Sequence, residues 1–135
     1  MNYSKEAINK LSDWIEDDVK ANNWLIANNY KELSMLKDAV SRRNKPLEYL
    51  LVNKHFILAA FVNAIWNDSK AFDMLMKNKG IHWAATANSI NGDQNADSWL
   101  RKNKLEHYAD LAKKIQFKLR KEGDQATSLF NSPIK

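Results

Sequence analysis

The sequence predicts an all-α fold, a single domain of antiparallel helix hairpins in a short repeat-like array, built as an α-solenoid or an irregular bundle. Three observations predict it. A length of 135 residues is usual for one domain. Only three glycines and two prolines interrupt the chain, and apolar residues recur every three or four positions almost throughout. The third observation is that residues 56–80 are repeated as residues 81–105.

The first part of the chain contains three amphipathic segments. Residues 4–21 predict a helix with Ser4 as its N-cap, and residues 30–40 predict the next. Asn44 and Pro46 then indicate the cap and first turn of a short helix. The apolar stripes of these helices are Ile8, Leu11, Ile15 and Val19; Tyr30, Leu33, Leu36 and Val40; and Leu47, Leu50 and Leu51.

Residues 56–66 are apolar almost all round, with Asn63 as the chief exception. A helix that is apolar on every side is buried on every side. We therefore expect this segment, which contains Ala60, to be the central buried helix.

The repeat aligns residues 56–80 with residues 81–105 without a gap, and ten of the 25 positions are identical. Each copy reads as helix, tight turn, helix. Asp68 or Ser69 and Asp93 are the expected N-caps of the second helices, and Asn91-Gly92 is the expected turn. A unit of this length cannot bury its apolar face alone, so neighbouring units must cover one another.

Two further segments resemble the repeat. The first helix of a third copy begins at Glu106 and places Ile115 under Ile90. Upstream, five residues match the repeat at a shift of 39 positions. They are Ile26, Asn28, Lys31, Met35 and Leu36, which align with Ile65, Asn67, Lys70, Met74 and Leu75.

Charge is distributed unevenly although the formal net charge is only +5. Four carboxylates lie within six residues, at Asp13, Glu16, Asp17 and Asp18, whereas residues 101–121 hold eight basic and two acidic side chains. This pattern predicts one acidic and one basic end of the molecule.

Phe117 is out of place in the last helix. The apolar stripe there is Leu105, Tyr108, Leu111, Ala112, Ile115 and Leu119, and at 100° per residue Phe117 lies about 180° from Tyr108. Its ring should point away from the core, among Lys113, Lys114, Arg120 and Lys121. An aromatic ring within a cationic patch suits the acidic rim of a protein partner or single-stranded nucleic acid. Alternatively, the tail covers the ring with Leu129, Phe130 or Ile134.

Two more aromatic assignments follow from the repeat. Trp66 aligns with Asn91, a polar turn residue, so we expect its ring to be partly exposed and add it to the candidate binding residues. Trp83 and Trp99 align with apolar residues and are expected to pack. Residues 1–122 are expected to form the helical domain, and residues 123–135, which lack helical periodicity, a loose or docking tail.

The sequence offers no recognisable catalytic, cofactor or metal motif. The absence of cysteine excludes disulfides, thiolate zinc ligands and cysteine nucleophiles. His82 and His107 occupy equivalent repeat positions, which gives them no reason to converge on a metal with His55. The acidic cluster fans around the exposed side of its helix, as a solvated face does. No membrane partner is expected, because the longest uncharged run, residues 55–67, is shorter than the roughly 18 residues that span a bilayer.

These observations favour a cytoplasmic, non-enzymatic module that binds a protein partner through a helical surface. The candidate binding residues are Phe117, Lys113, Lys114, Arg120, Lys121 and Trp66. The alternatives are a nucleic-acid-binding protein that uses the basic face of residues 101–121, and an enzyme whose site is assembled only by the fold.

Overall fold

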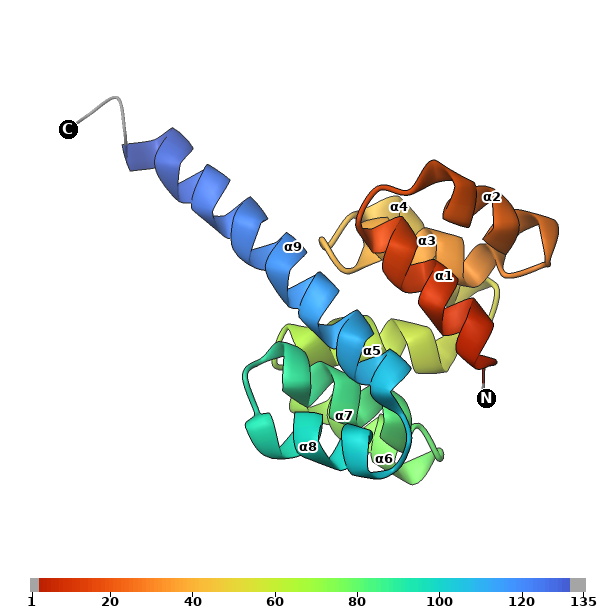
Figure 1. Ribbon diagram of the computed structural model, residues 1–135. Coiled ribbons are helices and arrows are strands. Elements are labelled where there is room, and N and C mark those ends of the chain that lie inside the picture. The colour runs from red at the N-terminus through yellow and green to blue at the C-terminus, as the bar shows by residue number, and fades with distance from the viewer. Residues whose placement is uncertain (1–2, 132–135) are drawn as a thin grey trace.

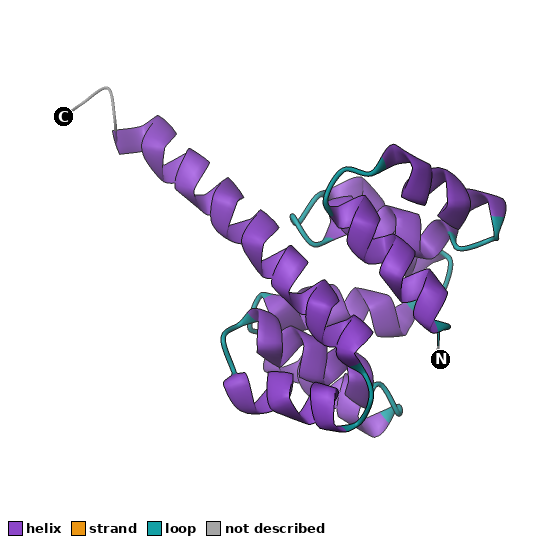
Figure 2. Cartoon of the chain, viewed as in Figure 1, coloured by secondary structure: helices purple, strands orange, loops and turns teal. Residues whose placement is uncertain are grey.

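The computed structural model describes residues 3–131, with side chains described for residues 3–123. These residues form nine α-helices and no strand, which confirms the all-α prediction (Figures 1 and 2). The helices are α1 (Lys5–Ile15), α2 (Val19–Ala27), α3 (Lys31–Ala39), α4 (Asn44–Val52), α5 (Phe56–Ile65), α6 (Ser69–Lys77), α7 (Ile81–Ile90), α8 (Gln94–Lys102) and α9 (Glu106–Asn131).

The first eight helices form four consecutive hairpins, and α9 follows as a single long helix. The first helices of the hairpins lie inside and pack in sequence, α1 on α3, α3 on α5, α5 on α7 and α7 on α9. Because α9 also packs on α1, these five inner helices form a closed ring. The second helices, α2, α4, α6 and α8, lie outside, each against its own inner helix and the next one.

The 25-residue period runs through all four hairpins. Backbone φ angles are positive at residues 17, 42, 67 and 92 in the hairpin turns, and at residues 29, 54, 79 and 104 between hairpins, so each series advances by 25. At each of these eight helix ends, the residue after the positive-φ residue donates its N–H to the carbonyl five residues earlier, as Asp68 does to Asn63 at 3.1 Å. Only one of the eight positive-φ residues is a glycine, Gly92; the other seven carry a side chain and still adopt the left-handed backbone conformation.

Equivalent side chains have equivalent surroundings. Leu25, Leu50, Leu75 and Leu100 occupy one repeat position, and all four are fully buried. Ile65 and Ile90 are likewise 4% and 5% exposed. A second column consists of Asn28, Asn53, Asn78 and Asn103, each of which donates its side-chain amide to the carbonyl four residues earlier at 2.7–2.9 Å. The repeat therefore specifies both the core and the helix ends.

Three details of the sequence reading were wrong in the first half of the chain. The helix expected over residues 4–21 ends at Ile15, because Asp17 turns the chain and Asp18 caps α2; Val19 is consequently 62% exposed. The upstream match at a shift of 39 aligns Ile26, which is 52% exposed, with Ile65, which is buried, so the true register is 25. The N-cap position of α4 is Arg43 rather than Asn44.

The central helix and the later caps were predicted correctly. In α5 the residues from Leu58 to Ile65 are buried except for Asn63, although Phe56 at its start is half exposed. Asp68 and Asp93 accept hydrogen bonds from the first-turn N–H groups of α6 and α8. Trp83 is buried in the ring against Phe61 and Tyr108, whereas Trp99 is 37% exposed and packs only in part.

Helix α9 continues where the other inner helices stop. Phe117 stands at the position of the turn residues Asp17, Arg42, Asn67 and Gly92, and Lys118 stands at the position of the capping aspartates. Phenylalanine disfavours the left-handed conformation, and lysine has no acceptor for a cap, although the chain does turn at Arg42 and Arg43 in the second hairpin. In α9 the helix runs on to Asn131 and projects past the end of the ring (Figure 1).

Candidate functional site

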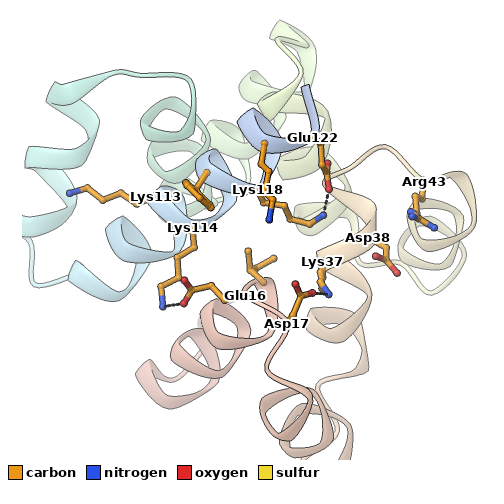
Figure 3. Close-up of a pocket in the computed structure, with 12 residues that line it drawn as sticks. Glu16, Asp17, Lys37, Asp38, Arg43, Lys113, Lys114, Lys118 and Glu122 are labelled. Atoms are coloured by element: carbon orange, nitrogen blue, oxygen red, sulfur yellow. Dashed lines mark hydrogen bonds and ion pairs between the residues drawn. The ribbon is translucent and has the colours of Figure 1, made fainter. Parts of the chain in front are cut away.

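A cleft of about 590 Å³ lies where α9 leaves the ring. Its walls come from the C-terminal end of α1, the C-terminal end of α3 with the following turn, and the middle of α9 (Figure 3). We call it the Phe117 cleft. It is lined by Ile15, Glu16, Asp17, Lys37, Asp38, Arg43, Lys113, Lys114, Phe117, Lys118, Lys121 and Glu122.

Phe117 is the exposed apolar side chain of this cleft. It is 67% exposed, which agrees with the prediction that it points away from the core. Its repeat position is a turn residue in the four hairpins, whereas in α9 the helix continues through it, so the side chain projects outward. An exposed phenylalanine is costly to hydrate and is a suitable anchor for another molecule.

Most acidic side chains of the cleft are already paired. Lys114 Nζ lies 2.7 Å from Glu16 Oε1 and 3.8 Å from Asp13 Oδ1. Lys37 pairs with Asp17, and the ammonium hydrogen bond holds the pKa of that carboxyl below its ordinary value. Lys118 pairs with Glu122 and donates to Ser41 Oγ at 2.9 Å. Figure 3 shows these three pairs as dashed contacts: Lys114–Glu16 joins α9 to α1, Lys37–Asp17 joins α3 to the α1–α2 turn, and Lys118–Glu122 lies within α9.

Three cations of the cleft have no such partner. Within residues 3–123, no ion pair joins Arg43, Lys113 or Lys121 to an acidic side chain. Arg43 faces the cleft from the α3–α4 turn, and Lys113 reaches away from the paired residues, towards the α7–α8 side (Figure 3). With only Asp38 left unpaired among the described carboxylates of the lining, the cleft retains a positive excess.

The internal repeat marks two of the lining residues as departures from its own rule. Three hairpins cap their second helix with aspartate, at Asp18, Asp68 and Asp93. The equivalent residues in the second hairpin and in α9 are Arg43 and Lys118, and Arg43 makes no capping bond. Both replacements exchange an acidic for a basic group, and both line the Phe117 cleft. Sequence reasoning missed Arg43, Lys37 and Lys118, although the 25-residue register would have found the first and the last.

The structure divides the predicted binding residues between two places. Phe117, Lys113, Lys114 and Lys121 line one cleft, but Lys114 is largely neutralised by its carboxylate partners. Arg120 and Trp66 lie together on the other side of α9, in a separate hollow of about 560 Å³. Residues 101–121 likewise do not form one basic face, because Arg101 pairs with Asp97 and Asp110 while Lys114 and Lys118 are also paired.

The prediction of separate acidic and basic ends was wrong. Closure of the ring brings the C-terminal end of α1 against α9, so Glu16 and Asp17 line the same cleft as the α9 lysines. Asp17 and Asp18 also belong to a turn rather than to a solvated helix face.

The histidines lie closer together than expected. The rings of His82 and His107 both contact Tyr108, at 5.5 and 4.9 Å between centroids. Burial lowers the pKa of both imidazoles and raises the pKa of the Tyr108 hydroxyl to about 12. Among the described side chains, no group of three histidine or carboxylate residues is arranged to hold a metal ion.

The proposed cover of Phe117 by the tail concerns side chains beyond the described ones. Leu129 and Phe130 lie in α9, whose backbone continues through residue 131, and Ile134 lies outside the described residues. Helix α9 therefore extends through residues 123–131, the first part of the segment that the sequence assigned to a loose or docking tail.

Comparisons with protein families, curated proteins and solved structures found no match for this chain. None of the described helices is long and apolar enough to cross a membrane.

Proposed function

We propose that this protein is a non-enzymatic interaction module that binds an acidic protein partner at the Phe117 cleft. The observation that carries the proposal is a phenylalanine, 67% exposed, beside cations that have no carboxylate partner within the described side chains. An apolar side chain of the partner would cover Phe117, while its carboxylates would pair with Arg43, Lys113 and Lys121.

The mixture of charges favours a protein over nucleic acid. Six basic and four acidic residues line the cleft, and three of the acidic ones form intramolecular pairs. Grooves that track single strands are positively charged along the path of the backbone, and the carboxylates of this lining interrupt such a path. A protein partner can match both signs, which is how electrostatic complementarity gives specificity.

The test begins with capture of proteins from the native cell on the immobilised full chain. A captured protein is then purified and its affinity measured for wild type, Phe117→Ala and the double variant Arg43→Glu/Lys121→Glu. The matched control is Lys77→Glu/Lys102→Glu, which makes the same change in net charge. Both control residues are exposed and lie at the C-terminal ends of α6 and α8, outside the cleft lining.

Phe117→Ala should weaken binding by about 1 kcal/mol or more, roughly fivefold, and leave the melting temperature nearly unchanged. The cleft reversal should slow association and reduce its dependence on salt, whereas the control should behave as wild type. Lys114 is unsuited to this test because its reversal would also break the pairs with Asp13 and Glu16. Equal affinity of all variants would refute the proposal, and loss of the partner on nuclease treatment would favour nucleic acid instead.

A further inference from the structure

A second hollow lies across α9 from the Phe117 cleft. It is formed where α5 and α7 end and is closed on one side by α9. We call it the Trp66 hollow. It has a volume of about 560 Å³ and is lined by Ile65, Trp66, Asn67, Ile90, Asn91, Gly92, Gln116, Leu119, Arg120 and Gly123.

Trp66 is a departure from the repeat, as Phe117 is. The equivalent residues in the other hairpins are Glu16, Ser41 and Asn91, all polar, so no packing rule of the repeat calls for an indole here. The ring is nevertheless held firmly. Its Nε1 donates to the carbonyl of Val40 at 3.0 Å, the guanidinium of Arg42 lies 5.0 Å from its centroid, and 41% of the residue remains exposed.

The charge of the hollow has one sign. Arg120 is the charged residue among those that line it, and Arg42 lies on the Trp66 ring. Arginine is scarce in this chain, with 4 against 17 lysines. Three of the four, Arg42, Arg43 and Arg120, gather around the exit of α9, and none of them is paired with a described carboxylate. The guanidinium group binds carboxylates in a planar, bidentate manner that lysine does not reproduce.

The two recesses lie on either side of the exposed part of α9. Gln116 and Arg120 line the hollow, while Phe117 and Lys121, the next residue in each case, line the cleft. A stable protein complex covers about 800 Å² on each partner, more than one recess of this size presents. A partner seated in the Phe117 cleft must therefore cover further surface, and a partner that crosses α9 would reach the Trp66 hollow.

We propose that the Trp66 hollow is a second contact site for the same acidic protein partner, and that it takes an aromatic or aliphatic side chain flanked by carboxylates. The apolar side chain lies on the free part of the Trp66 ring, and a carboxylate pairs with Arg120. The inference rests on the proposed function, because the hollow and the cleft serve one partner that straddles α9. Two side chains of the hollow are already fixed by hydrogen bonds. Gln116 Nε2 donates to the Ile90 carbonyl at 2.9 Å, and the Trp66 indole donates to the Val40 carbonyl, so binding requires little further ordering of these side chains.

The test is an NMR titration of the isotope-labelled full chain with defined peptides. The probe is acetyl-Glu-Glu-Phe-Glu-Glu-amide; the comparison ligands are the same peptide with glycine for phenylalanine, the same with lysine for glutamate, and a short oligothymidylate. The Trp66 indole signal, assigned with Trp66→Phe, reports on the hollow, and the Phe117 and Lys121 amides report on the cleft. Arg120→Gln removes the proposed carboxylate partner, and Lys102→Gln is the exposed control.

The expected result is that the probe shifts the Trp66 indole as well as the Phe117 and Lys121 signals. Separate copies of the short peptide can occupy the two recesses, so Arg120→Gln should weaken the response of the indole about tenfold, the loss of one charge-assisted hydrogen bond, and leave the response of the cleft unchanged. The glycine and lysine peptides should shift the indole far less.

Each other outcome has one meaning. Shifts confined to the cleft would overturn the second site and leave the proposed function standing. Shifts confined to the hollow would remove the cleft from the interface and overturn the shared partner. An indole response that is equal for the lysine peptide, stronger for oligothymidylate, or unchanged in Arg120→Gln would overturn the assignment of an acidic ligand.

Discussion

Lys114 on α9 lies 2.7 Å from Glu16 at the C-terminal end of α1, so the last helix of the array is paired with the first. This contact lies on the seam at which the ring of inner helices closes. The same closure forms one wall of the Phe117 cleft, which means that the array and its candidate site depend on residues about 100 positions apart.

The seam should be held by apolar packing rather than by this ion pair. The Lys114 and Glu16 side chains are 31% and 60% exposed, and exposed pairs contribute about 0–1 kcal/mol. A double-mutant cycle of Lys114→Gln and Glu16→Gln, measured by chemical denaturation, should give a coupling energy in that range. Leu111→Ala, which empties a fully buried position of α9, should cost about 2–5 kcal/mol. A coupling energy as large as the loss at Leu111 would contradict this division.

Arg43→Asp should stabilise the fold and weaken binding. Aspartate caps the second helix in three hairpins, and Arg43 occupies the equivalent position without a capping bond. Restoring the cap should add about 1 kcal/mol to the free energy of unfolding, while it places a negative charge in the Phe117 cleft. Asp68→Ala, which removes an existing cap, should cost a similar amount. Melting temperatures and partner affinity measured together check both effects, and an unchanged melting temperature for Arg43→Asp would show that the turn cannot accept the cap.

Ala60→Leu should destabilise the protein. Ala60 is 8% exposed in α5, a helix in which seven of ten residues are buried, and additional methylene groups in a packed core cost about 1–3 kcal/mol. Ala27→Leu makes the same change at an exposed position of α2 and serves as the control. Thermal unfolding of both variants gives the comparison, and equal melting temperatures would contradict the placement of α5 in the packed core.

Stability should fall in mild acid because of His82 and His107. Burial lowers the pKa of both imidazoles in the folded protein, so the unfolded chain binds their protons first as the pH falls. Their contribution is complete above a pH of about 6.5, the unfolded value, and is lost as the pH falls through the folded pKa values. The drop in melting temperature between about pH 7 and pH 5 should be smaller in His82→Gln/His107→Gln than in wild type. If the melting temperatures of the two proteins fell equally with pH, the protonation of these imidazoles would not contribute to the loss of stability.

The fold was predictable where turns carry recognisable residues. Asp68, Asp93 and Gly92 identify the third and fourth hairpins, and the identities between these hairpins give the register. The first hairpin was misread because Asp17 turns the chain without glycine or proline, and the apolar spacing continues across the turn to Val19. The column of Asn28, Asn53, Asn78 and Asn103 would have corrected this, since one polar residue recurs at a fixed interval.

The candidate site was predictable only in part. Helical periodicity placed Phe117 on the exposed side of its helix, because that depends on one helix alone. Helical periodicity could not show that Lys37 and Arg43 line the same cleft as Phe117, or that Arg120 lines a different recess. Those relationships depend on contact between α9 and α1, and nothing in a local pattern encodes which distant helix closes a ring.

A closed ring also limits how such a protein can change in size. In an open solenoid each added unit requires only its neighbours, so duplication lengthens the array without disturbing it. Here a fifth hairpin inserted after Gly80 would have to separate α1 from α9, or widen the spacing of all five inner helices around side chains such as Trp83 and Phe61 that fill their centre. Either change opens a packed interior. The chain can therefore vary by substitution at its turns, as at Arg43 and Trp66, but not by gaining or losing a unit.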